Sequence, residues 1–454
     1  MSGLTARLGE FLADISFSRI PSDAIPLVRD AFTDTVAVTM AGVAEPVTDI
    51  TRRAAMADGR EGESRVCLST LRASATASAL ISGTAAHALD FDDQSLSGHP
   101  SAVLVPAILA EGEALDSSGE ELVAAYVAGY EVWAELVARN SGYHSKGWHP
   151  TSVFGVLGAA AAVAVLQHLP AEKAATSLAI AGSLAAGLAV NFGTMTKPLH
   201  AGVAAQNGVL AARLAGRGLT AAADALENPK GFLHAFSPKS EPDRALPKDL
   251  GQNWHLLWQR LCVKKYPTCY FMHRSFDATV RMLAGRNIGA QDIAGIDVTM
   301  GKGQTAVLVN ERPRDGLEAK FSEQFAMAAA VVIGRMGIAE VSDAVVRRPD
   351  IQNFFPKVKL HAVDEYDPRD PVHSPTERVV VRLNNGGTID SGPIASIKGH
   401  ATDPLTTEEL WAKFSECTAA THNDGERKRL FDLLQSVEKL KSPRSLPTCG
   451  NIFQ

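Results

Sequence analysis

The sequence predicts a mainly α-helical protein in which a large all-α domain is interrupted by a smaller α+β domain. Apolar residues recur at three- and four-residue spacing up to about residue 261, mostly in alanine-rich stretches with few charges. After residue 273 the pattern alternates like that of β-strands, and from about residue 404 it is helical again. A chain of 454 residues also exceeds what one core usually holds. We therefore expect residues 1–263 plus 403–454 to form the helical domain and residues 264–402 the inserted one.

Capping and breaking residues place the helices of the first part. Ser22 and Asp23 stand where they can cap a helix that continues to Gly42. Short segments with Gly or Pro, such as residues 215–218 and 227–232, separate later helices. The helices expected here span residues 1–15, 21–42, 73–90, 102–116, 118–140, 153–168, 171–190, 200–216, 219–226 and 248–261.

The inserted part mixes both periodicities. Residues 384–387, with the sequence NNGG, predict a tight hairpin turn. In the tail, Thr406 or Thr407 with Glu409 predicts a capping box at the start of a helix. The expected helices span residues 276–283, 320–333, 404–417 and 424–437, and the expected strands span 293–300, 354–363 and 377–389.

Composition excludes several classes of protein. A net charge of -6 and a pI near 6.1 argue against a nucleic-acid partner. The apolar stretch 174–192 consists mostly of Ala and Gly, so we expect a buried helix there and no membrane span. The N-terminus lacks the pattern of a signal peptide. Without a CxxC pair, the cysteines predict reduced thiols of a cytoplasmic protein and no iron–sulfur cluster; they are Cys67, Cys262, Cys269, Cys417 and Cys449.

The segment HALDFDDQSLSGHP, residues 87–100, is the first candidate for chemistry. Asp90, Asp92 and Asp93 follow a predicted helix, where they oppose the helix dipole and repel one another. Such a conflict favours a functional role over turn capping. We expect Asp90 and His99 to act as an acid–base pair or to orient a substrate.

Two further segments place a histidine or a lysine beside the start of a helix. His149 lies in a Gly- and Pro-flanked loop before a helix whose N-terminus suits a carboxylate. A metal site using His144 and His149 is the weaker interpretation, because no third ligand lies nearby. Lys197, with His200 close behind, stands before an alanine-rich helix, which favours an anion-binding lysine in a cavity over a solvated one.

The fourth segment lies where the helical pattern changes to the mixed one. Lys264, Lys265, Tyr266, His273 and Arg274 gather there, and either a ligand cleft or a basic linker explains them equally well. Together the four segments suit the binding of a small polycarboxylate and the transfer of a proton. The chain has no phosphate-binding glycine loop, GxSxG elbow or HExxH motif, so kinase, serine-hydrolase and zinc-protease functions are not expected.

These segments resemble the MmgE/PrpD family, which includes 2-methylcitrate dehydratase, cis-aconitate decarboxylase and iminodisuccinate epimerase. The similar motifs occur in the family's order over nearly the whole chain: HALDFDD with HPS, GWHPT, GTMTKPLHAG, ENPKGF, KKYPTCYFMH, AKFSEQFA and KGHATDPLTTEELWAKF. The resemblance implies an all-α domain built from both chain ends, an inserted α+β lid domain and a homodimer. It also implies catalysis without a metal or an organic cofactor.

The resemblance also implies roles for particular residues. As catalytic residues it implies Asp90, His99, His149, Lys197 and Lys264. As substrate-binding residues we expect Gln94, His200, Lys265 and His273.

Two positions depart from the family pattern. Gln94 stands where several members have Thr, and Gln324 with Phe325 stands where dehydratase or decarboxylase members often have Pro-Tyr. Loss of that tyrosine removes a proton donor and argues against methylcitrate or cis-aconitate as the substrate.

The leading hypothesis is a cofactor-independent lyase of the 2-methylcitrate dehydratase type that acts on a small di- or tricarboxylate. His149 or Asp90 would abstract the α-proton, His99 would assist the leaving group, and Lys197 and Lys264 would hold carboxylates. An epimerase or racemase of a dicarboxylate is the second hypothesis and a cis-aconitate decarboxylase the third. A non-catalytic carboxylate-binding protein is the alternative from another class.

Overall fold

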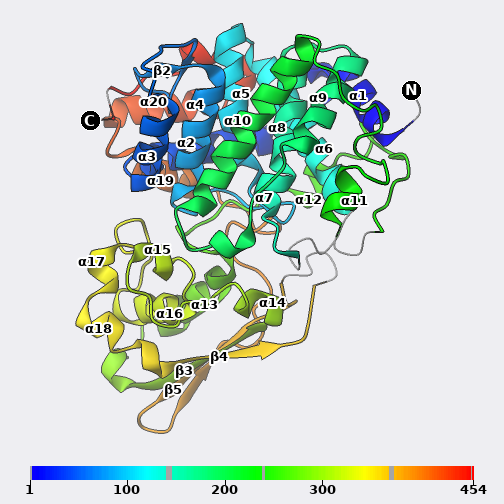
Figure 1. Cartoon of the computed structure of the whole chain (residues 1–454). Coiled ribbons are helices and arrows are strands. Elements are labelled where there is room, and N and C mark those ends of the chain that lie inside the picture. The colour runs from blue at the N-terminus through cyan, green and yellow to red at the C-terminus, as the bar shows by residue number, and fades with distance from the viewer. Residues whose placement is uncertain (1–2, 140–145, 238–240, 368–372, 451, 454) are drawn as a thin grey trace. The chain divides into compact units, whose positions relative to one another are not determined.

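The computed structural model describes residues 3–139, 146–237, 241–367, 373–450 and 452–453. The protein is mainly helical, as the sequence predicts (Figure 1). It divides into two compact units. The first comprises Met1–Asn191, Met195–Val263 and Thr406–Gln454, and the second comprises Phe192–Thr194 and Lys264–Leu405.

The first unit is a packed set of helices with one short hairpin between strands β1 (Ser64–Arg65) and β2 (Arg72–Ala73). Helix α10 packs against α4, α5 and α8, and α5 also packs against α4 and α8. All four helices contribute buried residues to the apolar core. Its helices are α1 (Leu4–Asp14), α2 (Ala24–Gly42), α3 (Pro46–Ala55), α4 (Ala75–Ala88), α5 (Pro100–Leu115), α6 (Gly119–Ala138), α7 (Pro150–Val153), α8 (Gly155–Leu166), α9 (Ala171–Ser183), α10 (Thr196–Gly216), α11 (Phe232–Phe236), α12 (His255–Gln259), α19 (Thr407–Thr418) and α20 (Asp424–Leu434).

The second unit is built on a four-stranded sheet of order β4-β3-β5-β6. Strand β3 (Ile293–Gly301) pairs in parallel with β4 (Val358–Val363) and antiparallel with β5 (Arg378–Leu383). The NNGG turn joins β5 to β6 (Thr388–Asp390), and its Gly386 has a φ of +86°. Helices α13 (His273–Leu283) and α16 (Glu323–Val332) pack against each other and share an apolar core with the sheet. The shorter helices are α14 (Lys302–Thr305), α15 (Gly316–Ala319), α17 (Asp343–Val346) and α18 (Pro349–Gln352).

Helices α4 and α10 are in close contact (Figure 1). This contact brings the segment 87–100 and the segment that contains Lys197 and His200 together. A Cβ atom added at Gly83 would lie 3.0 Å from the Cα of Gly202. A Cβ added at Gly202 would overlap the backbone carbonyl of Leu80. Because only glycine permits this approach, the end of α4 and the start of α10 lie in the same region of the first unit.

Several predicted helices are shorter than expected, and one is absent. Residues 219–222 are irregular and residues 223–226 form turns, because Leu226 is the only buried residue of 219–226 and an unpacked helix of this length is unstable. The expected helix 171–190 ends at Ser183, and its last residues are partly exposed, with Gly187 at a φ of +114°. Gly251 interrupts 248–261, of which only α12 is helical. The capping box of Thr406 and Glu409 is confirmed.

Helix α3 was not predicted, although Pro46 at its start and Arg52 and Arg53 in its last turn are recognised helix signals. All five cysteines are free thiols, as expected. Within the part of the chain that the structure describes, no helix is long and apolar enough to cross a membrane.

Candidate active site

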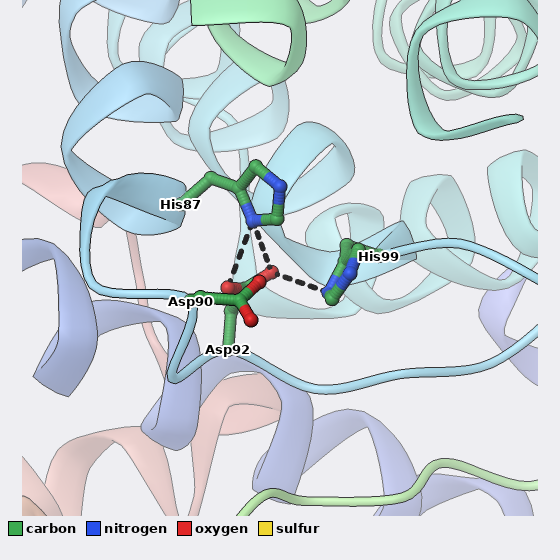
Figure 2. A group of neighbouring side chains, drawn as sticks. All are labelled: His87, Asp90, Asp92 and His99. Atoms are coloured by element: carbon green, nitrogen blue, oxygen red, sulfur yellow. Dashed lines mark hydrogen bonds and ion pairs between the residues drawn. The ribbon is translucent and has the colours of Figure 1, made fainter. Parts of the chain in front are cut away.

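The loop that follows α4 turns sharply and directs its side chains back toward the helix (Figure 2). Helix α4 ends at Ala88, and Asp90 adopts a left-handed conformation with a φ of +53°. Left-handed residues other than glycine are uncommon, and they concentrate at functional sites. The loop ends at His99, which precedes α5.

Asp92 is the centre of this loop, because its carboxylate faces two imidazoles (Figure 2). The Nδ1 atom of His87 lies 2.9 and 3.0 Å from the two carboxylate oxygens. The Nδ1 atom of His99 lies 3.0 Å from Oδ2 of Asp92 and 2.9 Å from the backbone oxygen of Asp93. Burial acts to raise the pKa of Asp92, but His87 and His99 outweigh it and hold that pKa well below its ordinary value. Burial lowers the pKa of His87 to about 3, so its imidazole is neutral.

Lys197 lies in the first turn of α10 and forms a buried ion pair with Asp90. Its side chain is 7% exposed and that of Asp90 is 6% exposed. The ammonium is therefore held in a site with little water, where its interactions with anions are stronger than at a surface. This position agrees with the prediction that Lys197 is not a solvated lysine.

His149 precedes α7, and its backbone N–H donates to the carbonyl of Gly187 over 3.0 Å. Its ring stacks on that of His87 at 6.0 Å, and its Nδ1 lies 3.0 Å from Nδ1 of His200. Burial and, after it, the charge of Lys197 lower the pKa of His149 well below its ordinary value. Burial and then Lys197 also lower the pKa of His200. Both imidazoles are therefore neutral at pH 7.

The carboxyl group of Asp93 contacts a hydroxyl group, whereas its backbone oxygen faces His99. The carboxyl group accepts a hydrogen bond from the hydroxyl of Ser101, which in turn lies 2.7 Å from the hydroxyl of Tyr126. Burial raises the pKa of Asp93 to about 8, and the nearby carboxylates of Asp34 and Asp92 add to this effect. Asp93 is therefore mostly a neutral acid at pH 7.

The C-terminal segment also holds the loop. Lys413 of α19 pairs with Asp34 of α2 at 2.5 Å and donates to the backbone carbonyl of Phe91 over 2.7 Å. Its Nζ atom also lies 4.0 Å from the centroid of the Phe91 ring. A residue more than 300 positions away in the sequence thus fixes the backbone between Asp90 and Asp92.

The structure brings together five of the nine predicted site residues in the first unit. They are Asp90, His99, His149, Lys197 and His200.

Of the other four predicted residues, Gln94 lies in the loop between α4 and α5, and three lie in the second unit. Gln94 pairs through its backbone with Cys262, at 2.9 Å in both directions. Lys264 and His273 are buried and belong to the second unit, as does Lys265, whose ammonium lies 3.3 Å from Asp277. Their catalytic and binding roles stay predictions.

Sequence reasoning missed His87 as a site residue and gave Asp92 no role of its own. The spacing of these two residues gave no signal, because their contact depends on the left-handed turn at Asp90. His144, named as a metal ligand in the weaker interpretation, lies outside the described residues.

Four side chains of this cluster have the donor types that bind a divalent cation. One atom each of His87, Asp90, Asp92 and His99 lies within 4.8 Å of the others. In the structure, however, Asp90 pairs with the ammonium of Lys197, and Asp92 faces imidazole nitrogens. The carboxylates of this cluster therefore already have partners within the protein, which suits acid–base chemistry.

A buried group of neutral imidazoles beside a paired ammonium is typical of an enzyme that transfers protons. A model of the MmgE/PrpD N-terminal domain matches residues 6–245, and one of the MmgE/PrpD C-terminal domain matches residues 266–439. The chain therefore belongs to the MmgE/PrpD family, which confirms the resemblance seen in the sequence.

Among its relatives are three cis-aconitate decarboxylases. The one from Homo sapiens is 30% identical over 396 residues, which is 83% of this chain and 80% of the relative. The one from Mus musculus is 30% identical over 352 residues, or 75% of this chain and 71% of the relative. The one from Aspergillus terreus is 24% identical over 466 residues, or 97% of this chain and 94% of the relative.

Proposed function

We propose that this protein is a lyase that acts on a small di- or tricarboxylate by transferring a proton at the carbon next to a carboxylate. The observation that supports this proposal most is that a buried cation, Lys197, lies near a buried neutral base, His149. Lys197 supplies positive charge for a substrate carboxylate, and it lies close enough to His149 to lower the pKa of that imidazole. Few ordinary cores contain such a combination.

Each group has a defined part in the proposed reaction. His149 takes the proton from the α-carbon, and the electron pair left behind spreads onto the adjacent carboxylate. Lys197 stabilises the charge that develops there, and a site with little water makes this effect large. In a dehydration, protonated His99 gives its proton to the departing hydroxyl, water leaves and a carbon–carbon double bond forms. Asp92 favours the charged form of His99 that this step needs.

Two reactions of this class have support. Decarboxylation of cis-aconitate is supported by the relatives, which bear that name. In it a carbon–carbon bond breaks, CO2 leaves and the carbon takes a proton. Dehydration of a hydroxy acid, the leading hypothesis from the sequence, is supported by the neutral state of His149, because a dehydratase needs an unprotonated base first.

One experiment separates these reactions from the alternatives. The protein is incubated in heavy water with a panel of small di- and tricarboxylates, including cis-aconitate, and followed by proton NMR and by ultraviolet absorbance. CO2 release identifies a decarboxylase, and a new alkene with loss of the hydroxyl identifies a dehydratase. Deuterium at the α-carbon without net conversion identifies an epimerase. Binding by calorimetry with no exchange at that carbon indicates a carboxylate-binding protein and contradicts the proposal.

Substitution tests the assigned residues. Lys197→Ala and His149→Ala should each lose most of the turnover while far-UV circular dichroism stays that of the parent protein. Near-parental turnover in either variant contradicts the role given to that residue. The participation of Lys264, the action of residues 264–402 as a lid and the homodimer stay predictions.

A further inference from the structure

Asp92 has hydrogen-bond partners that define the tautomers of two histidines. A carboxylate and a backbone carbonyl can only accept hydrogen bonds. The Nδ1 atom of His99 lies within 3.0 Å of one of each, so this nitrogen must carry the proton. The Nδ1 atom of His87 lies within 3.0 Å of both oxygens of Asp92, so it must carry its proton as well.

We propose that Asp92 is a positioning residue that holds the Nδ1–H groups of both His87 and His99. The neutral form of each ring is then the Nδ1–H tautomer, and Nε2 is the nitrogen that each ring presents to the site. This inference rests on the proposed function, because it assigns the nitrogen through which His99 acts. It also adds His87 to the site as a second imidazole held in the same tautomer.

The side chain of Asp92 is suited to this task by charge and by shape. It is fully buried, and its two oxygens serve two donors at once. An amide of the same shape has one accepting atom and one donating NH2 group. An asparagine would therefore direct N–H bonds at an imidazole nitrogen that already carries hydrogen, and one ring would have to change its tautomer. The charge contributes as well, because a carboxylate stabilises an imidazolium and an amide does not.

His87 is placed where such a tautomer is useful. Its ring centre lies 4.4 Å from that of His99 and 6.0 Å from that of His149. Its Nε2 atom is buried and has no hydrogen-bond partner among the residues that the structure describes. A buried acceptor without a partner is costly, and in a native protein it needs an explanation such as a bound ligand or water. A hydrogen-bond donor on the substrate would satisfy it.

The test reads the tautomers directly, without any substrate. Protein with 15N-labelled histidine is studied by long-range 1H–15N correlation, and the His87 and His99 signals are assigned with His87→Gln and His99→Gln. In the parent protein the neutral form of both rings should show a protonated Nδ1 and an unprotonated Nε2. A protonated Nε2 on a neutral His87 or His99 overturns the proposal, and this outcome requires no variant of Asp92 to fold.

Asp92→Asn should convert at least one ring to the other tautomer and lower kcat by about 10²- to 10⁴-fold. Asp93→Asn is the matched control, because Asp93 is adjacent and equally buried but its carboxyl contacts Ser101. The control should leave both tautomers unchanged. If Asp92→Asn leaves both tautomers and kcat unchanged, Asp92 has no positioning role. If the parent protein turns over none of the acids tested, the proposed function fails, but the tautomers still decide the role of Asp92.

Discussion

Replacing Lys413 with Met should destabilise the first unit and disturb the site, although Lys413 is not one of its reacting groups. The side chain of Lys413 is 5% exposed and that of its partner Asp34 is 0% exposed. Methionine keeps the apolar length of the lysine stem. It removes the ammonium that pairs with Asp34 at 2.5 Å and holds the carbonyl of Phe91 at 2.7 Å.

The expected loss in the free energy of unfolding depends on the carboxylate of Asp34, which stays buried when Lys413 is replaced. Removing one member of a buried ion pair costs about 3–5 kcal/mol, mainly because the other charge remains buried without compensation. Replacing both members by neutral groups is often close to neutral. We therefore expect Lys413→Met to lower the free energy of unfolding by about 3–5 kcal/mol, and the double variant with Asp34→Asn to recover at least half of that loss.

Tryptophan fluorescence measures this effect on the correct part of the molecule. All five tryptophans belong to the first unit, and Trp411 lies on the same helix as Lys413. Urea unfolding of the parent, both single variants and the double variant gives a double-mutant cycle. A loss below 1 kcal/mol for Lys413→Met, or simple additivity in the cycle, refutes the reasoning that the pair is buried and coupled.

Three further predictions concern packing, pH and metals. Gly202→Ala should lower stability by about 1–3 kcal/mol and should also lower turnover, because the added Cβ overlaps the carbonyl of Leu80. The control Gly425→Ala meets no such contact and should not destabilise the protein. Burial raises the pKa of Glu323 to about 8 from 4.5, so its contribution to stability is full below pH 4.5 and is lost as the pH rises through 8. Amide hydrogen exchange in α16 should therefore accelerate with pH more steeply than the intrinsic exchange rate does. This excess should be larger in the parent protein than in Glu323→Gln, and equal pH slopes in the two proteins contradict the prediction. Dialysis against EDTA should leave turnover unchanged, since the carboxylates of the site already pair with protein groups; inactivation that a divalent metal reverses would show a resident ion.

Long periodic segments of the fold were predictable from the sequence, and weakly packed ones were not. Most of the long helices and all three expected strands of the second unit occur near their predicted places. Residues 219–226 failed because alanine-rich composition favours a helix, while the chain offers that segment almost nothing to pack against. Local propensity is a weak guide where tertiary contacts decide.

The candidate site was predictable where a residue broke a local rule. Asp90 and Lys197 stood out because carboxylates at a helix end and a lysine between apolar helices conflict with simple packing. His87 broke no rule, because a histidine in the last turn of a helix is favourable. Its role depends on the left-handed turn at Asp90 that brings Asp92 back beneath it, and no spacing rule gives that turn.

The substitution at Phe325 shows a different limit. From the sequence, Phe325 counted as the loss of a proton donor and argued against decarboxylation. In the structure Phe325 is fully buried in the apolar core of the second unit. Its ring therefore has a packing role that the sequence pattern did not indicate.

The three carboxyl groups of the DFDD segment lie close together, and their mutual repulsion is overcome because each has a different partner or charge state. Each is in a different state within four residues. Asp90 is paired with an ammonium, Asp92 is charged and faces two imidazoles, and burial with nearby negative charge makes Asp93 mostly neutral at pH 7. Lys413 adds a compensating charge close behind them. The cluster thus concentrates acid–base groups of separate pKa in one buried place, which is the condition for assigning one of them to hold a proton and another to move it.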